Sequence, residues 1–220
     1  MLIPTEPRKK FAVLNACEFL FNYTPDFPLN CMDYFETFGV VVWTYSELAY
    51  VKNEPIDVIA KSLPSDAFLY LDKKEWVYYL LLNDTKPKKR QIFTMAHEIG
   101  HIELGHFIEF DVSNLNDKQR YILDVEANIF ASNVLAPVNL IDFWNLKKPK
   151  DVAEKFNMSI RASQVRLANL DKDRQHINAI NYHALNSLFF SQQGSSVDFE
   201  VDWSEHDSKV GFTTNYHMSC

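Results

Sequence analysis

The sequence predicts an α+β fold, in which a small antiparallel or mixed sheet is followed by two long helices and a helical C-terminal part. Short β-branched and aromatic runs lie between residues 40 and 82. Two longer segments with helical periodicity follow, over residues 90–105 and 117–135. The 220 residues are 47% hydrophobic and 23% charged, which is the composition of an ordinary globular protein with ample core.

The first 40 residues predict two helices. Lys9–Tyr23 carries apolar side chains at helical spacing, and two prolines end this helix. A second, short helix is expected over Leu29–Phe38, where Gly39 stops it. Basic residues ahead of the first apolar stretch superficially suggest a signal peptide. Glu18 interrupts the stretch and no small-residue cleavage site follows, so we expect an amphipathic helix.

Three apolar runs predict the sheet. Val40–Tyr45 is β-branched and aromatic, as in a strand that is buried on both faces. Ala67–Leu71 and Trp76–Leu82 flank a polar Asp-Lys-Lys segment and predict an antiparallel hairpin. A polar connection lies between the first run and this hairpin, with a helical turn expected around Asp57–Ser62.

The next helix contains an H-E-x-x-H motif, formed by His97, Glu98 and His101. Residues four apart share one face of a helix, so both imidazoles can reach one metal ion. Glu98 lies about 100° further round the helix, where it can take a proton from a water on the metal. This is the arrangement of a zinc metallopeptidase with Glu98 as general base. The alternative is an amphipathic core helix that carries these polar residues by accident.

A basic cluster opens the motif helix and a glycine closes it. The cluster consists of Lys86, Lys88, Lys89 and Arg90. Positive charge is a poor match for a helix N-terminus, and the sequence leaves open whether the cluster is a solvated helix end or a nucleic-acid contact. Gly105 suits the helix end. His106 lies about 140° from the ligand face, so we predict a surface or capping role for it in preference to a third ligand.

The helix expected over Asp117–Leu135 offers two acidic residues at its middle. Glu126 lies in an apolar stripe, and a buried carboxylate needs a cation or a strong hydrogen-bond partner. Asp124 lies in a polar row and needs no special partner. We therefore predict Glu126 as the third metal ligand, which leaves a fourth position for water. The alternative is a buried ion pair between Glu126 and an arginine such as Arg90.

Two segments of these helices carry a recognisable pattern, R-Q-I-F-T-M-A-H-E-I-G-H and E-A-N-I-F-A-S-N-V-L-A-P. Together they resemble the ImmA/IrrE family of bacterial metallopeptidases over roughly residues 40–170. The residues that match the first motif are Arg90, Phe93, Thr94, Ala96, His97, Glu98, Gly100 and His101. Those that match the second are Glu126, Ala127, Asn128, Phe130, Ala131, Leu135 and Pro137.

The resemblance implies a zincin-like, gluzincin-type metallopeptidase core, which we place at residues 1–137. It implies one Zn²⁺ per chain, held by His97, His101 and Glu126, with Glu98 as the base. It also implies a cytoplasmic gene-regulatory protease, often encoded by phages and mobile elements. Such proteins are thought to cleave a helix-turn-helix repressor and so release a silenced operon. Asn128 and Asn133 lie near the Glu126 face and could orient the ligands.

Residues 138–192 are predicted to form a helical extension that packs on the core. Its order of helix, short turn and helix is that of a helix-turn-helix unit. Its second helix offers the polar side chains Arg161, Gln164 and Arg166, so a DNA-binding regulator is one alternative function. The net charge of −7 argues against it, and direct nucleic-acid binding is not expected. A non-catalytic, zinc-stabilised interaction protein that acts as an anti-repressor is the other alternative.

A last helical pattern covers Asp173–Gln192. Residues 193–220 form an acidic tail, for which an edge strand and disorder are equally open. Cys17, Cys31 and Cys220 are far apart and odd in number, as expected of reduced thiols in a cytosolic protein. No apolar run approaches about 20 residues, so no membrane span is expected. The sequence leaves the substrate, the second electrophile, the activation trigger and the oligomeric state open.

Overall fold

The computed structural model describes residues 4–23, 26–64, 66–177 and 185, and the predicted α+β class is confirmed for this part of the chain. No helix within these ranges is long and apolar enough to cross a membrane. In chain order the elements are α1 (Glu6–Tyr23), α2 (Cys31–Thr37), β1 (Val41–Thr44), α3 (Tyr45–Lys52), α4 (Ile56–Ser62), β2 (Ala67–Asp72), β3 (Val77–Leu82), α5 (Lys88–Glu103), α6 (His106–Glu109), α7 (Asp117–Leu135), α8 (Val138–Phe143), α9 (Pro149–Lys155) and α10 (Ile160–His176).

The sheet has three strands in the order β1-β3-β2. β2 and β3 form the predicted antiparallel hairpin, with Leu69 opposite Leu80. β1 is parallel to β3, with Val42 opposite Leu80. A parallel pair requires a crossover connection, and α3, α4 and β2 make up the chain between these two strands. The sheet is therefore mixed.

One face of the sheet is buried and the other is open to solvent. Leu69, Leu80 and Leu82 point into the core, whereas Val41 and Trp43 of β1 are 37% and 42% exposed. The prediction that the first strand is buried on both faces is therefore wrong. The β-branched and aromatic run reflects an edge strand that has apolar side chains on its open face as well.

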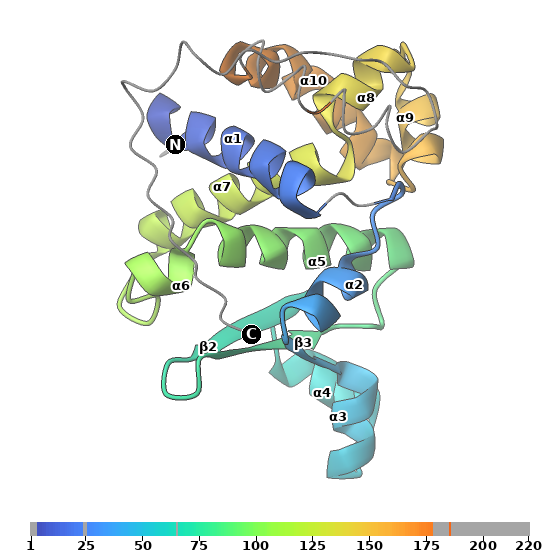
Figure 1. Cartoon of the computed structure of the whole chain (residues 1–220). Helices are drawn as coiled ribbons and strands as arrows, with labels where there is room; N and C mark the ends of the chain where they lie inside the picture. Colours follow the sequence, from blue (N-terminus) through green and yellow to red (C-terminus); the bar gives the residue numbers. More distant parts are fainter. Residues whose placement is uncertain (1–3, 24–25, 65, 178–184, 186–220) are drawn as a thin grey trace.

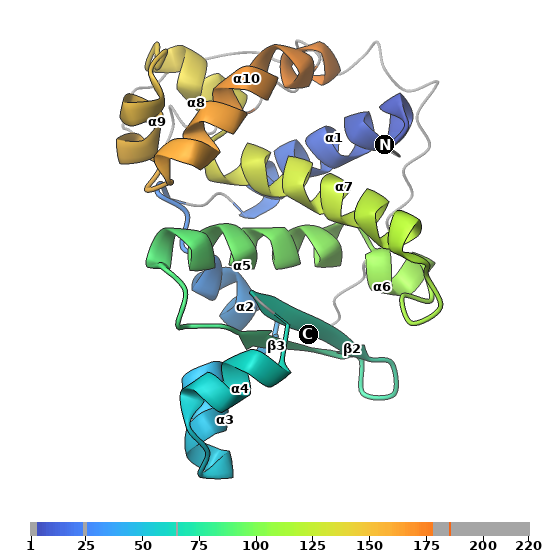
Figure 2. The ribbon, with the colours of Figure 1, turned by 180° about the vertical axis from the view of Figure 1, so that it is seen from behind.

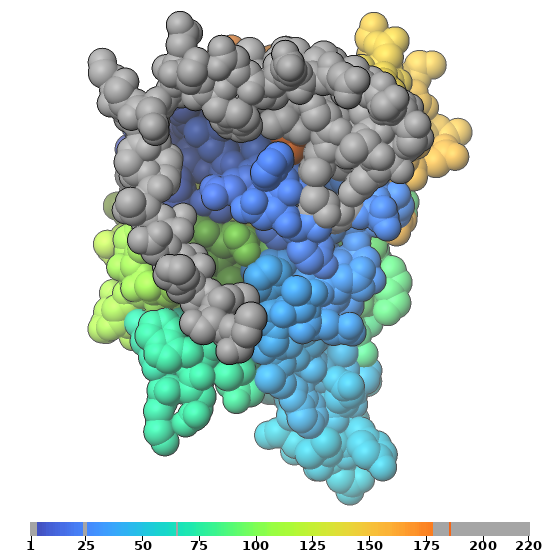
Figure 3. Space-filling model, in the orientation of Figure 1, coloured from blue at the N-terminus to red at the C-terminus, as the bar shows by residue number. Residues whose placement is uncertain are grey.

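A pair of short helices follows β1, where the sequence predicted a polar connection and one helical turn. α3 begins directly after the strand because Thr44 and Glu47 form a capping box. α4 agrees with the expected turn. The two helices share a small core of Tyr45, Ala49 and Ile59. They protrude from the rest of the molecule, at the bottom of the space-filling view (Figure 3).

The other helices lie in layers on the buried side of the sheet (Figure 1). α5 covers the sheet, and α1 and α7 lie on the far side of α5, with α8, α9 and α10 beyond them. The view from behind shows α7 running along α5 (Figure 2). Phe35 of α2, Leu80 of β3, Ile99 of α5 and Phe130 of α7 belong to one continuous core. The two motif helices therefore lie at the centre of the molecule.

α5 and α7 pack closely at Gly100. A Cβ atom added there would lie 3.1 Å from both the carbonyl oxygen of Ala127 and Cδ1 of Phe130. Contacts this short are rarely tolerated, so the absent side chain is what allows the two helices to approach. The approach brings the polar side chains of α7 to the histidines of α5.

The last helices retain the predicted order of helix, short turn and helix, but Arg166 is not available to DNA. It is 1% exposed, and its Nε donates a hydrogen bond of 2.8 Å to the carbonyl oxygen of Ala136. Its other nitrogens bind Asn133 and Asp173. Arg166 therefore does not serve as the DNA contact that the alternative of a DNA-binding regulator offered, because this arginine joins α10 to α7.

α10 continues to His176, so it takes in the beginning of the helix predicted from Asp173. Most of that helix, and the acidic tail over residues 193–220, lie outside the described residues. The boundary after residue 137 and the helix-turn-helix character of the C-terminal part stay predictions.

Candidate metal centre

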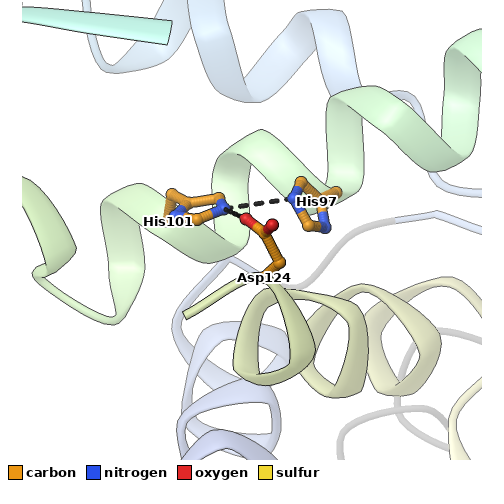
Figure 4. Close-up of side chains that lie close together, drawn as sticks. All are labelled: His97, His101 and Asp124. Carbon is orange, nitrogen blue, oxygen red and sulfur yellow. Dashed lines mark hydrogen bonds and ion pairs between the residues drawn. The ribbon is translucent and has the colours of Figure 1, made fainter. Parts of the chain in front are cut away.

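His97 and His101 lie one turn apart on α5 and face α7 (Figure 4). Their Nε2 atoms are 3.1 Å apart. Asp124 of α7 reaches the same point, with its Oδ1 3.6 Å from Nε2 of His101. One ligand atom from each of the three side chains lies within 4.8 Å of the other two. Among the described residues, these three side chains form a group that could hold a metal ion.

A hydrogen bond at Nδ1, the ring nitrogen that points away from His101, orients His97. Its Nδ1 is 3.0 Å from Oδ1 of Asn128. The amide oxygen is an acceptor, so Nδ1 carries the proton and Nε2 has a free lone pair. Asp124 and Asn128 are four residues apart on α7, so one face of this helix supplies both a carboxylate to the group and a partner to His97.

His101 is oriented in the same way by His106. The two Nδ1 atoms are 2.9 Å apart, and Nε2 of His106 is 3.3 Å from Oε2 of Glu126. The carboxylate can only accept, so a neutral His106 carries its proton on Nε2 and offers Nδ1 as an acceptor. Nδ1 of His101 must then be the donor. The lone pairs on Nε2 of His97 and Nε2 of His101 therefore face each other at 3.1 Å, which is unfavourable unless a cation lies between them.

The spacing of the three side chains suits Zn²⁺. Bonds of about 2.0–2.1 Å in a tetrahedral site place neighbouring ligand atoms about 3.3 Å apart. The separations of 3.1 and 3.6 Å lie on either side of that value. Two imidazoles and one carboxylate are a frequent ligand set of catalytic zinc, with a fourth position for water. Asp124 is 54% exposed, so the group is open to solvent on its side.

The electrostatic surroundings of His97 and Asp124 favour the protonation states that bind metal. Burial, helped by His101, lowers the pKa of His97 to about 4, so this imidazole is neutral at pH 7. Contact with His101 lowers the pKa of Asp124, so its carboxylate is charged. Metal ligands must be deprotonated, and the pKa shifts of His97 and Asp124 favour that state.

Glu98 follows His97 on α5 but does not belong to the ligand group. It is partly buried, and burial raises its pKa to about 7. A carboxyl group whose pKa lies near the working pH can both accept and release a proton, as the predicted base must.

The structure brings Asp124, and not the predicted third ligand Glu126, into the group with the two histidines. Glu126 is buried, as the apolar stripe predicted, but its carboxylate is bound by Arg8 of α1. Oε1 accepts from Nε of Arg8 at 2.5 Å, and Oε2 accepts from Nη2 at 2.6 Å. The alternative of an arginine partner is the one the structure favours, although Arg90 itself pairs with Asp66. Helical periodicity could not reveal a partner 118 residues away.

Asp124 is a candidate ligand that its position in the sequence did not indicate. Its polar neighbours on the helix surface suggested a solvated row, and it is indeed half exposed. The available signal was the spacing of Asp124 and Asn128, since an acid and an amide four residues apart can serve one metal site from one helix face.

His106 was expected at the surface or as a cap, and this prediction is wrong because its side chain is 0% exposed. α5 ends at Glu103, and Gly105 adopts a left-handed conformation with φ of +68°. The chain turns there into α6, which begins at His106. The position extrapolated from a continuous helix therefore does not apply, and the turn brings the imidazole back against His101.

The two asparagines have different surroundings. Asn128 contacts His97. Asn133 donates a hydrogen bond of 3.0 Å to Asp173 and accepts one of 3.0 Å from Arg166. The structure therefore places Asn133 in the buried cluster that joins α7 and α10, and not beside the histidines.

Comparison with known proteins supports a metallopeptidase-type site. The sequence model of the family Peptidase_M78, described as the IrrE N-terminal-like domain, matches residues 51–168. This range is more than half of the chain and includes α5 and α7 completely. No curated protein matches the chain. α1, which supplies Arg8, lies outside the matched range.

Proposed function

Because the chain belongs to the Peptidase_M78 family, we propose that it is a zinc-dependent endopeptidase. The metal ligands in this proposal are His97, His101 and Asp124. The observation that carries it is the pair of Nε2 lone pairs held face to face beside a charged carboxylate. Such an arrangement is costly in a protein that binds no cation there.

The remaining chemistry falls to the side chains around the ligands. A bound zinc ion would supply a Lewis acid for the peptide carbonyl and for the attacking water. Glu98 would accept a proton from that water and deliver it to the leaving amine. Asn128 would hold His97 in the tautomer that leaves Nε2 free.

Metal content and peptide cleavage together test this proposal. Glu98→Gln is expected to retain zinc and to lose at least about 100-fold in cleavage rate, because general bases contribute roughly that much or more. His97→Ala is expected to lose both zinc and cleavage. Glu154→Gln, an exposed change on α9, is the matched control. Undiminished cleavage by the Glu98→Gln protein would overturn the general-base role, and zinc binding without cleavage by the unaltered protein would favour a zinc-stabilised interaction protein.

We further propose that the substrate is a regulatory protein of the helix-turn-helix repressor class, cleaved in the cytoplasm to release a silenced operon of phage or mobile-element origin. The support is the resemblance of the two helix motifs to the ImmA/IrrE family. The buried position of Arg166 argues against the rival reading of a DNA-binding regulator. Incubation with the repressor encoded beside this protein tests the proposal, and an intact repressor after prolonged incubation with the zinc-loaded protein would contradict it.

A further inference from the structure

We infer that Arg8 and His106 are positioning residues of the metal centre, which act through Glu126 to hold His101 in its metal-binding tautomer. The inference rests on the proposed function, because it needs His101 to be a ligand. It extends that function to α1, which lies outside the range that matches the family.

The contacts form one unbranched chain from the surface to the ligand. Arg8 donates from Nε and Nη2 to the two oxygens of Glu126, at 2.5 and 2.6 Å. Oε2 of Glu126 is 3.3 Å from Nε2 of His106, and Nδ1 of His106 is 2.9 Å from Nδ1 of His101. The two ring nitrogens of His106 and both carboxylate oxygens of Glu126 are thus engaged. We name this chain of contacts the relay; it consists of Arg8, Glu126, His106 and His101.

Arg8, at the outer end of the relay, determines which atom donates in every hydrogen bond of the relay. A guanidinium group only donates and a carboxylate only accepts, so the arginine fixes Glu126 as the acceptor for His106. His106 then presents a lone pair to His101, which must donate from Nδ1. The neutral imidazole of His101 cannot also carry a proton on Nε2, so that nitrogen is left for the metal. A ligand histidine commonly donates directly to a carboxylate, and here a second histidine is inserted between them.

Because the middle of the relay is buried, each of its hydrogen bonds needs the partner that the relay itself supplies. Glu126 and His106 are almost completely enclosed, so water cannot replace a lost partner. Without Arg8, the carboxylate of Glu126 keeps only His106 as a partner, Oε1 loses its donor, and the buried charge lacks a countercharge. His106 could then rotate or exchange tautomers, and Nδ1 of His101 would lose its fixed acceptor.

Arg8 is itself held in position from two sides. Its guanidinium lies over the ring of Phe110, 5.4 Å from the centroid, while it binds Glu126. Phe110 follows α6 and Glu126 belongs to α7, so one side chain joins α1 to both elements. Both ribbon views show the N-terminal end of α1 on the same side of the molecule as α6 (Figures 1 and 2). The relay is therefore complete only when α1 lies against α7.

The experiment compares zinc affinity in full-length variants, measured by competition with a chromophoric chelator. Arg8→Gln removes the charge and the paired donors, and we expect it to raise the zinc Kd about 10–100-fold, as for other partners of metal ligands. Arg8→Lys, which restores a cationic donor, should recover part of the loss. Lys10→Gln, an exposed change on the same helix, is the matched control and should leave the Kd unchanged.

His106 offers a second comparison that separates positioning from packing. Gln can accept with its amide oxygen and donate with its amide nitrogen, so His106→Gln should retain more zinc affinity than the apolar His106→Leu. The visible spectrum of the cobalt-substituted protein should change in Arg8→Gln and His106→Leu and stay unchanged in Lys10→Gln. Thermal unfolding of the metal-free variants verifies that each has folded.

The outcomes distinguish this inference from the proposed function. Failure of the unaltered protein to bind zinc would overturn the metal site itself, and the inference with it. A folded Arg8→Gln protein with unchanged Kd and an unchanged cobalt spectrum would overturn the inference alone. Equal losses in His106→Gln and His106→Leu would also overturn it, because hydrogen bonding would then be irrelevant.

Discussion

At the scale of single residues, Asp124 and Glu126 show how two acids on one helix acquire different roles. They are two positions apart, so their side chains point about 200° apart around α7. Asp124 faces the histidines of α5 and is partly solvated, whereas Glu126 faces α1 and is enclosed. This geometry supports the proposed division, in which Asp124 binds the metal directly and Glu126 orients His101 through His106.

These roles predict different losses on mutation. Asp124→Ala should reduce zinc affinity by more than the roughly 10–100-fold expected for Glu126→Gln, because it removes a ligand and not a partner of one. Isothermal titration of both proteins with zinc measures the difference, with the exposed change Asp117→Asn as control. A larger loss in Glu126→Gln than in Asp124→Ala would return the third-ligand role to Glu126.

The two cysteines that the structure describes are predicted to be unreactive in the folded protein. Burial raises the pKa of Cys17 and of Cys31 to about 12, so both thiols are protonated at pH 8. The thiolate is the reactive form, so alkylation by iodoacetamide at pH 8 should require unfolding. Mass spectrometry of the peptides that contain each cysteine, with and without denaturant, is the measurement. Rapid labelling of Cys17 in the native protein would contradict the prediction.

At the scale of elements, close approach and buried polar clusters hold the helices in register. Gly100 sets the distance between α5 and α7, and Arg166 joins α7 to α10. The contact at Gly100 depends on the absence of a side chain, whereas Arg166 is a buried side chain that donates three hydrogen bonds. The candidate metal centre depends on the contact at Gly100, because His97, His101 and Asp124 come from the two helices that meet there.

Gly100→Ala should destabilise the protein by about 1–3 kcal/mol and weaken zinc binding, because the added methyl meets the backbone of Ala127. In an exposed helix the same change would stabilise by about 0.5–1 kcal/mol, so the sign of the change identifies its cause. Urea denaturation of the metal-free protein gives the free energy of unfolding. An increase in stability would show that the helices adjust without cost.

Arg166→Ala should lower the free energy of unfolding by about 3–5 kcal/mol, since it leaves the carboxylate of Asp173 nearly buried without its partner. Arg161→Ala, an exposed change on the same helix, should alter it by less than about 0.5 kcal/mol. Both values can be measured by chemical denaturation. Equal effects from the two substitutions would contradict the assigned role of Arg166.

At the scale of the whole molecule, the sequence predicted the helices and strands whose positions follow from local hydrophobic periodicity. The helix over Asp117–Leu135 has the predicted bounds, and the hairpin and the motif helix occur where they were expected. Capping by Thr44 and Glu47 creates α3, which hydrophobic periodicity did not indicate. The left-handed turn at Gly105 moves His106 into the core, and extrapolation along a straight helix could not foresee it.

Contacts that are distant along the chain account for the largest differences at the candidate site. The apolar stripe predicted the burial of Glu126 but could not name its partner, because Arg8 lies on a helix at the other end of the chain. The choice between Glu126 and Asp124 depended on how α7 is rotated about its own axis. That rotation is set by packing against α1 and α5 together, which no single segment contains.

The bond between Arg8 and Glu126 also bears on how the protein comes to be made. It closes a loop of 118 residues, and long loops are entropically costly to close before other contacts form. During synthesis α1 leaves the ribosome long before its partner helix exists, and domains assemble as their segments emerge. Under the inferred role of Arg8, the metal centre therefore reaches full affinity only after α7 has been made and α1 has packed against it.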